Sequence, residues 1–224
     1  MTDNELEELL KDCPTLYHMA EFGSWPSIRH QGLLSTTAVL DTYGISGEER
    51  RRIEDEHRPA KVRLEHVTLP RAVIRDQIPM RDSDLKRCLP PNLSPTDWYR
   101  LLNQKVFFWL TRERLVRMLK ADAYRTEANH VLEIEARALM EAHRDAIWLC
   151  PINSGATKPM AHPRGEDSFL RIPNYPYDNW RKKRRKGERV VELAVDYSVP
   201  DVSDLVTRVV EMRGDEELAV VYVR

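Results

Sequence analysis

The sequence is poor in residues and patterns that several common classes of protein need. Only 8 of its 224 residues are glycine, and none lies in a glycine-rich loop of the kind that cradles phosphate groups. Its three cysteines, Cys13, Cys88 and Cys150, are scattered and include no C-x-x-C pair. This pattern excludes a zinc ribbon and a disulfide scaffold, so we expect reduced thiols.

Long apolar runs and a net charge are also missing. No hydrophobic segment approaches the length of a membrane span, and the acidic residues 1–12 lack the apolar region of a signal peptide. The formal net charge is -1, so the protein as a whole would not attract nucleic acid, although a local basic patch could. These absences predict a cytoplasmic protein without a membrane partner.

The apolar content is sufficient for one core. Hydrophobic residues make up 42% of the chain, which suits a single domain over residues 1–224. Short strands and short helices follow one another irregularly, which favours an α+β fold over a doubly wound parallel sheet. Strands are predicted at 16–19, 62–69, 72–75, 106–110, 131–135, 147–150, 169–172, 190–195, 206–211 and 218–223. Helices are predicted at 4–11, 24–32, 46–57, 94–102, 112–121 and 136–143. The proline-rich residues 80–95 are expected to form an irregular loop.

One segment, residues 171–196, has two halves of opposite character. The first half holds aromatic residues followed by an unbroken basic run, and the second is the apolar strand 190–195 with Glu192 inside it. Rings beside cations are typical of a grip on single-stranded nucleic acid. The candidate residues are Tyr175, Tyr177, Trp180, Arg181, Lys182, Lys183, Arg184 and Arg185. Two alternatives remain open: the segment binds an acidic protein acceptor, or it forms a helix docked on its own domain.

Three predicted strands each carry a group suited to chemistry. They are His18 in LYHMA, the rings of VFFWL at 106–110, and Glu192 in VVELAV. In this order they resemble the ADP-ribosyltransferase fold, in which a histidine, an aromatic residue and a glutamate on three central strands surround NAD. The LYH motif and the later Gly32-Leu33-Leu34 turn are similar to the opening of the DarT family of bacterial DNA ADP-ribosyltransferase toxins.

The resemblance implies split mixed β-sheets with short flanking helices, and NAD as a substrate. It assigns Glu192 as the catalytic residue, which would offset positive charge on the ribose and take a proton from the acceptor. His18 would donate to a ribose hydroxyl, a ring would stack on nicotinamide, and an arginine would pair with the pyrophosphate. The implied NAD-binding residues are Tyr17, His18, Phe107, Phe108, Trp109, Arg58 and Arg75. No metal is required. The turn at 153–157 is either a further wall of this site or an ordinary loop.

The middle motif departs from the family pattern. The family supplies a tyrosine there, whereas this chain has Phe107, Phe108 and Trp109, which keep a stacking face but lack a phenol hydroxyl. The first expectation is a transferase acting on DNA or RNA in a toxin or defence context, with an antitoxin or immunity partner. One alternative is a non-catalytic domain that binds nucleic acid or another ligand. The other is an RNA 2'-phosphotransferase, which shares the fold and opens with a histidine motif.

Overall fold

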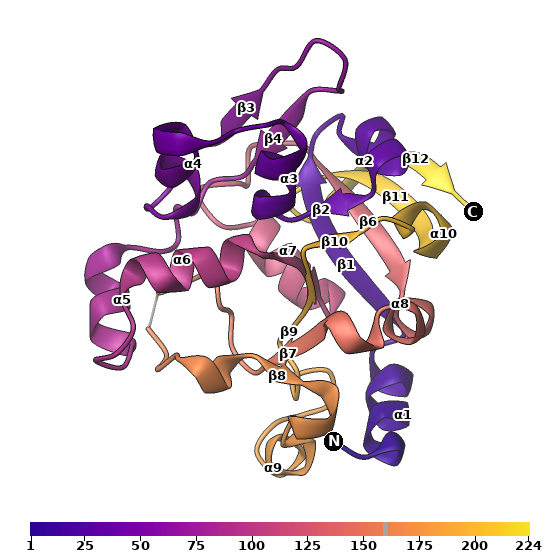
Figure 1. The fold of residues 1–224 in the computed structure, drawn as a ribbon. Coiled ribbons are helices and arrows are strands. Elements are labelled where there is room, and N and C mark those ends of the chain that lie inside the picture. The colour runs from indigo at the N-terminus through magenta and orange to yellow at the C-terminus, as the bar shows by residue number, and fades with distance from the viewer. Residues whose placement is uncertain (159–160) are drawn as a thin grey trace.

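The computed structural model describes residues 1–158 and 161–224 and has an α+β fold (Figure 1), as the sequence predicts. The helices are α1 (Asp3–Asp12), α2 (Trp25–Gln31), α3 (Thr36–Thr42), α4 (Gly47–Glu54), α5 (Asp82–Cys88), α6 (Pro95–Asn103), α7 (Arg112–Leu119), α8 (Ala136–Ala142), α9 (Tyr177–Arg181) and α10 (Val202–Leu205). The strands are β1 (Thr15–Glu21), β2 (Leu33–Leu34), β3 (Val62–Leu64), β4 (Ala72–Ile74), β5 (Lys105–Trp109), β6 (Asn129–Glu135), β7 (Ile147–Cys150), β8 (Leu170–Arg171), β9 (Glu192–Asp196), β10 (Ser198–Val199), β11 (Val206–Arg213) and β12 (Glu216–Val223).

Eight of these strands form one large sheet, in the order β12-β11-β6-β1-β5-β9-β7-β8. Two smaller pairs, β10-β2 and β3-β4, lie outside it. Every strand pairing among the described residues is antiparallel. The family resemblance implied mixed sheets, so the expected parallel pairings are not found in this part of the chain.

The large sheet has a narrow seam between β1 and β5. These strands share a single register pair, Tyr17 with Trp109, whereas β1 pairs with β6 along its whole length and β5 pairs with β9 along its whole length. Beside that pair, Nδ1 of His18 lies 2.9 Å from the carbonyl oxygen of Phe107. A side chain therefore bonds to the neighbouring backbone where the strand ladder stops, and the sheet divides into two four-stranded halves.

Capped helices cover both faces of this sheet. The hydroxyl of Thr111 accepts a hydrogen bond from the backbone of Arg114 and begins α7, whose Leu115 and Leu119 pack on residues of β6 and β11. Ser94 begins α6 with a capping box, and α6 packs on the β5-β9-β7 half. Helices α1, α8 and α10 pack in the largest core cluster, with side chains from β1, β5, β6 and β9. No helix in the described ranges is both long enough and apolar enough to cross a membrane.

Candidate functional site

A cavity of about 1790 Å³ opens at the seam between the two halves of the sheet, lined by residues of β1, β4, β5 and β9 among others. Small-molecule sites usually enclose about 300–1,000 Å³, so this cavity can hold a ligand of dinucleotide size with space beside it. Its lining carries ten lysine and arginine residues against five aspartate and glutamate residues. This excess of positive charge suits an anionic ligand.

Glu192 is the buried carboxylate of this cavity. It is 4% exposed, begins β9, and lies opposite Trp109 on one side and Cys150 on the other. Burial raises its pKa to about 7, against the opposing effects of Ser154, Arg114 and Arg164. Near neutral pH, part of the protein population therefore carries the charged carboxylate and part the neutral acid. A pKa close to the working pH is the one that suits a general base.

The turn at residues 153–157 holds that carboxylate. The backbone N–H of Ser154 donates to Oε2 of Glu192 at 3.1 Å. The buried guanidinium of Arg164 donates to the carbonyl oxygens of Ser154 and Ala156, each at 2.9 Å. The turn therefore lines the cavity, as one of the two sequence alternatives proposed, and Arg164 fixes it from behind. Sequence reasoning missed Arg164, because a single arginine in a loop gives no pattern.

His18 is half-buried and lines the same cavity. Because a carbonyl oxygen only accepts, the contact with Phe107 assigns the ring proton to Nδ1 and leaves Nε2 as an acceptor. Burial lowers the pKa of His18 to about 4, so the ring is neutral at pH 7. The neutral ring can therefore accept a hydrogen bond at Nε2 but not donate one there, which disagrees with the expectation that His18 donates to a ribose hydroxyl.

The three rings of β5 have different surroundings. Phe108 is 1% exposed and belongs to the main core, with its ring centroid 5.7 Å from that of His18. Phe107 packs in the α6 cluster against Phe169. Trp109 is half-buried and lies directly across from Glu192. All three line the cavity, but the Trp109 ring is the stacking face nearest the carboxylate.

Arg58 is occupied by structural contacts. It is 7% exposed, and its guanidinium donates to the carbonyl oxygens of Arg75 and Ile53 and to the amide oxygen of Asn103. Burial lowers its pKa to about 10. Since each guanidinium nitrogen already has a protein acceptor, Arg58 is not placed to pair with a pyrophosphate.

Arg75 is the better placed of the two expected arginines. Its Nη1 donates to the Asn129 side chain at 2.8 Å, and its guanidinium carbon lies 5.2 Å from the Tyr124 ring centroid. Its Nη2 is buried and has no hydrogen-bond partner among the described residues. Arg75 lines the cavity, so a phosphate oxygen there would satisfy an unpaired donor.

Tyr17 lies outside the cavity lining, unlike its neighbour His18. Tyr17 packs instead on the α7 side, in the cluster that contains Leu115 and Leu119. The cavity lining therefore gives no support to the expected contact between Tyr17 and NAD.

The aromatic part of the expected nucleic-acid grip is buried. Tyr175 and Tyr177 are each 1% exposed and belong to the main core. The hydroxyl of Tyr175 donates to the carbonyl oxygen of Arg189 at 2.6 Å, and that of Tyr177 accepts from the Arg189 guanidinium. Trp180 is half-buried against the same core. The two tyrosines offer no stacking face to a nucleic acid, so that prediction is wrong.

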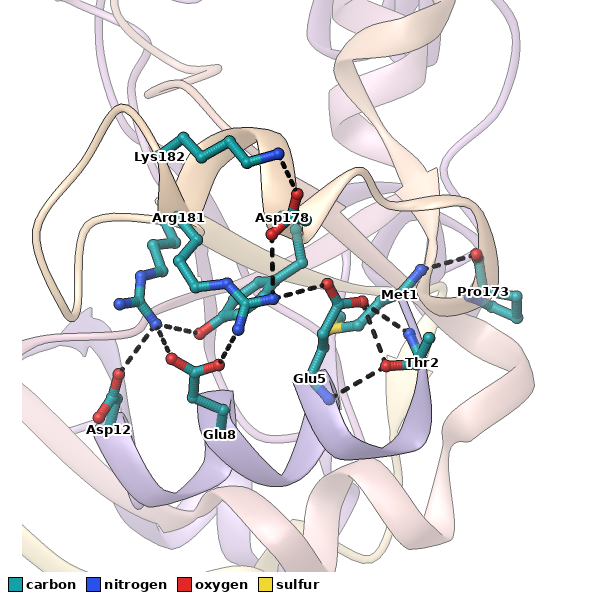
Figure 2. A network of polar contacts seen from close by, with 11 residues as sticks. Met1, Thr2, Glu5, Glu8, Asp12, Pro173, Asp178, Arg181 and Lys182 are labelled. Atoms are coloured by element: carbon teal, nitrogen blue, oxygen red, sulfur yellow. Dashed lines mark hydrogen bonds and ion pairs between the residues drawn. The ribbon is translucent and has the colours of Figure 1, made fainter.

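The basic run is largely neutralised by acids of this same chain. Figure 2 shows Arg181 beside Glu5 and Glu8 of α1, and the N-terminal ammonium group donating to the Pro173 carbonyl. The ion pairs of the run are Arg181 with Glu5, Glu8 and Asp178, Lys182 with Asp178, Arg185 with Glu113, and Lys186 with Asp12. Helix α9 and the basic turn that follows it are thus docked on their own domain, which agrees with the third alternative except that only Arg181 of the run is helical.

Two residues of the run line the cavity. Arg184 and Arg185 are among its lining residues. The Arg184 guanidinium donates to the Pro151 carbonyl at 2.6 Å and lies 4.0 Å from the Trp180 ring centroid, and the Lys183 ammonium lies 5.8 Å from the same ring. The expected grip is therefore reduced to two arginines at the cavity wall.

The site residues identify no metal centre. Within residues 1–158 and 161–224, no group of three or more histidine, cysteine, aspartate or glutamate residues is placed to hold a metal ion. The described polar groups of the cavity instead suit hydrogen bonding and anion binding.

Residues 14–206 match DUF7002, a family of unknown function. Comparisons with curated proteins and with solved structures gave no match. The family match spans the seam, β1, β5 and β9, and therefore every central residue of the cavity described above. On this match, the chain belongs to DUF7002.

Proposed function

We propose that the protein is an NAD-dependent ADP-ribosyltransferase. One observation carries the proposal: His18, Trp109 and Glu192, on the neighbouring strands β1, β5 and β9, line a single cavity with an excess of positive charge. A hydrogen-bond acceptor such as Nε2 of His18 suits a ribose hydroxyl, and an aromatic ring such as Trp109 suits nicotinamide. A carboxylate such as Glu192 suits the positive charge that develops on the sugar.

The proposed reaction displaces nicotinamide from its ribose. The acceptor attacks the anomeric carbon, the carbon–nitrogen bond breaks, and nicotinamide leaves as a neutral molecule with the bonding electron pair. The anionic form of Glu192 stabilises the positive charge that develops on the sugar. The proton lost by the acceptor passes to Glu192, whose pKa near 7 allows it to accept that proton at neutral pH.

The remaining residues bind and orient the dinucleotide. Nε2 of the neutral His18 accepts from a ribose hydroxyl, Trp109 stacks on nicotinamide, and the free Nη2 of Arg75 donates to a phosphate oxygen. The aromatic ring replaces the tyrosine of the resembled family without supplying a hydroxyl. The reaction above does not use a phenol proton, so this departure is compatible with catalysis.

The test is incubation of the protein with NAD and, separately, with single-stranded DNA, RNA or protein as acceptor. Release of nicotinamide and a mass gain of one ADP-ribose unit on an acceptor are the expected results. Glu192→Gln should abolish both. Glu141→Gln, on an exposed carboxylate of α8, is the matched control and should leave both unchanged.

Two outcomes would contradict the proposal. If Glu192→Gln reacts as fast as the unaltered protein, the carboxylate is not catalytic. If NAD binds but nicotinamide is released with none of the acceptors, the domain is a non-catalytic binder, which was the second hypothesis from the sequence.

A further inference from the structure

The large sheet ends in an exposed strand, β12, which lies at its edge beside β11 (Figure 1). Nearly every residue of β12 is exposed. The apolar side chains Leu218, Val220, Val221 and Val223 are 37%, 55%, 41% and 64% exposed. Residues 218–223 read LAVVYV and contain no charge and no proline. An apolar edge of this length is a template for a further strand.

Two of these valines point to the same side of the sheet. Val220 lies opposite Val210 and Val223 lies opposite Arg208, and alternate residues of β11 share a face. Val210 is fully buried in the α7 cluster, but its register partner Val220 lies outside that cluster and is exposed. Two register shifts interrupt the β11-β12 pairing, which increases the twist of the strand without hiding these side chains.

The charges of β12 lie at its two ends. Glu216 begins the strand, Arg224 follows it, and the apolar run lies between them. Glu216 makes no ion pair within the described residues, and the Arg224 side chain, 44% exposed, contacts Glu135 at 3.2 Å. When two such strands run antiparallel about a twofold axis through Val220, Glu216 of each copy lies opposite Arg224 of the other.

We propose that β12 pairs with β12 of a second copy of this chain. The pairing is isologous, as expected for a twofold dimer, and joins two eight-stranded sheets into one. It satisfies the free backbone groups of both edges, covers Val220 and Val223 of both copies, and places opposite charges together at both ends. The hairpin β11-β12 lies almost wholly outside the residues that match the family.

The dimer is independent of the proposed enzymatic function. Four strands, β11, β6, β1 and β5, separate β12 from β9 in the sheet, and no residue of β12 lines the cavity. Loss of the dimer therefore leaves the NAD site intact, and failure of the NAD proposal leaves the dimer proposal unaffected.

The first experiment measures mass in solution by sedimentation over a range of protein concentrations. The unaltered protein is expected to be a dimer, and Val220→Lys should raise its dissociation constant by about tenfold or more, because like charges then meet at the axis. Val67→Lys is the matched control, since Val67 is 99% exposed in the turn between β3 and β4. A monomer at every concentration, or a dimer that Val220→Lys does not weaken, overturns the proposal.

The second experiment tests the register by exchanging charges. Glu216→Arg alone should weaken the dimer, because two arginines then face each other at both ends of the paired strands. The double variant Glu216→Arg, Arg224→Glu restores opposite charges and should recover the original dissociation constant. If the double variant is no tighter than Glu216→Arg, the two copies do not pair in this register and the proposal is wrong.

Discussion

The buried carboxylate of Glu192 should make the folded protein less stable as the pH rises. The side chain is 4% exposed, and the backbone N–H of Ser154 donates to its Oε2 at 3.1 Å. Glu192→Gln removes the charge and keeps an oxygen that can accept this bond. The variant therefore isolates the cost of burying the charge.

The size and sign of the effect follow from the pKa shift of this group. Its pKa rises from 4.5 to about 7 on folding, and each unit corresponds to about 1.4 kcal/mol, so the full effect is about 3 kcal/mol. Because the folded pKa is the higher one, the stability contributed by protonated Glu192 is fully present below pH 4.5 and is lost as the pH rises through 7. Glu192→Gln should match the unaltered protein near pH 4.5 and exceed its stability by about 3 kcal/mol at pH 8.

The assay is urea unfolding of both proteins at pH values from 4.5 to 8. We take the difference between the free energies of unfolding of the two proteins at each pH. The contributions of the titratable groups that both proteins share cancel in this difference. In thermal unfolding the same effect corresponds to a rise in Tm of roughly 6–12 °C at pH 8. Glu141→Gln, on an exposed side chain, should show no such trend. A constant difference across the pH range, or a less stable Glu192→Gln at pH 8, would refute the reasoning.

Three other substitutions test the scaffold of the site by urea unfolding. Gly32→Ala should lower the free energy of unfolding by roughly 2–5 kcal/mol, because φ is +84° and the added Cβ would lie 2.6 Å from Cα of Pro200. At the control position Gly23, φ is +77° but a Cβ would meet no atom within 4 Å, so Gly23→Ala should lose only the stability that the backbone strain costs. Equal losses at the two positions would contradict this reasoning. Arg164→Met should lower the free energy of unfolding by about 1–3 kcal/mol, because the Ala156 carbonyl loses its donor and the Ser154 carbonyl keeps only the Trp98 indole, and it should raise the pKa of Glu192 further, seen as a pH profile shifted upward. Arg189→Met should lower the free energy of unfolding by roughly 1.5–3 kcal/mol, since it removes the charged hydrogen bonds of a buried guanidinium to Glu8, Asp12 and the Tyr177 hydroxyl, although Glu8 keeps Arg181 and Asp12 keeps Lys186; a loss below about 1 kcal/mol would contradict the buried network.

Local signals in the sequence predicted most elements of the fold. The Ser94-Pro95 pair and Thr111 mark the first turns of α6 and α7, as observed, because capping depends on residues a few positions apart. The apolar run before Thr111 forms β5. Helix α5 was missed, since the prolines that follow it at 90, 91 and 95 suggest a loop and Leu85 is its one buried residue.

The basic segment was misread because its partners are remote in the sequence. Arg181 pairs with Glu5 and Glu8 of α1, more than 170 residues away, and the sequence gives no sign of that contact. Composition distinguishes a basic run from a neutral one, but only the fold decides whether its charges are already paired. The same limit applies to Arg58, whose acceptors are mostly backbone carbonyls.

The site residues were predicted in type but not in detail. His18 and Glu192 were identified by their positions in strands, and both line the cavity. The choice of Trp109 as the ring across from Glu192 depends on the register of β5 and β9. One position along a strand moves a side chain to the other face, and no local pattern fixes that register.

Calorimetric titration with NAD tests the central claim most directly. The unaltered protein should bind NAD, and Trp109→Leu should weaken binding by roughly tenfold or more, since a lost aromatic stack costs about 1–3 kcal/mol. Tyr17→Phe, on the register partner of Trp109 outside the cavity lining, should bind as the unaltered protein does. Absence of NAD binding, or equal affinity of Trp109→Leu and the unaltered protein, would contradict the site described here.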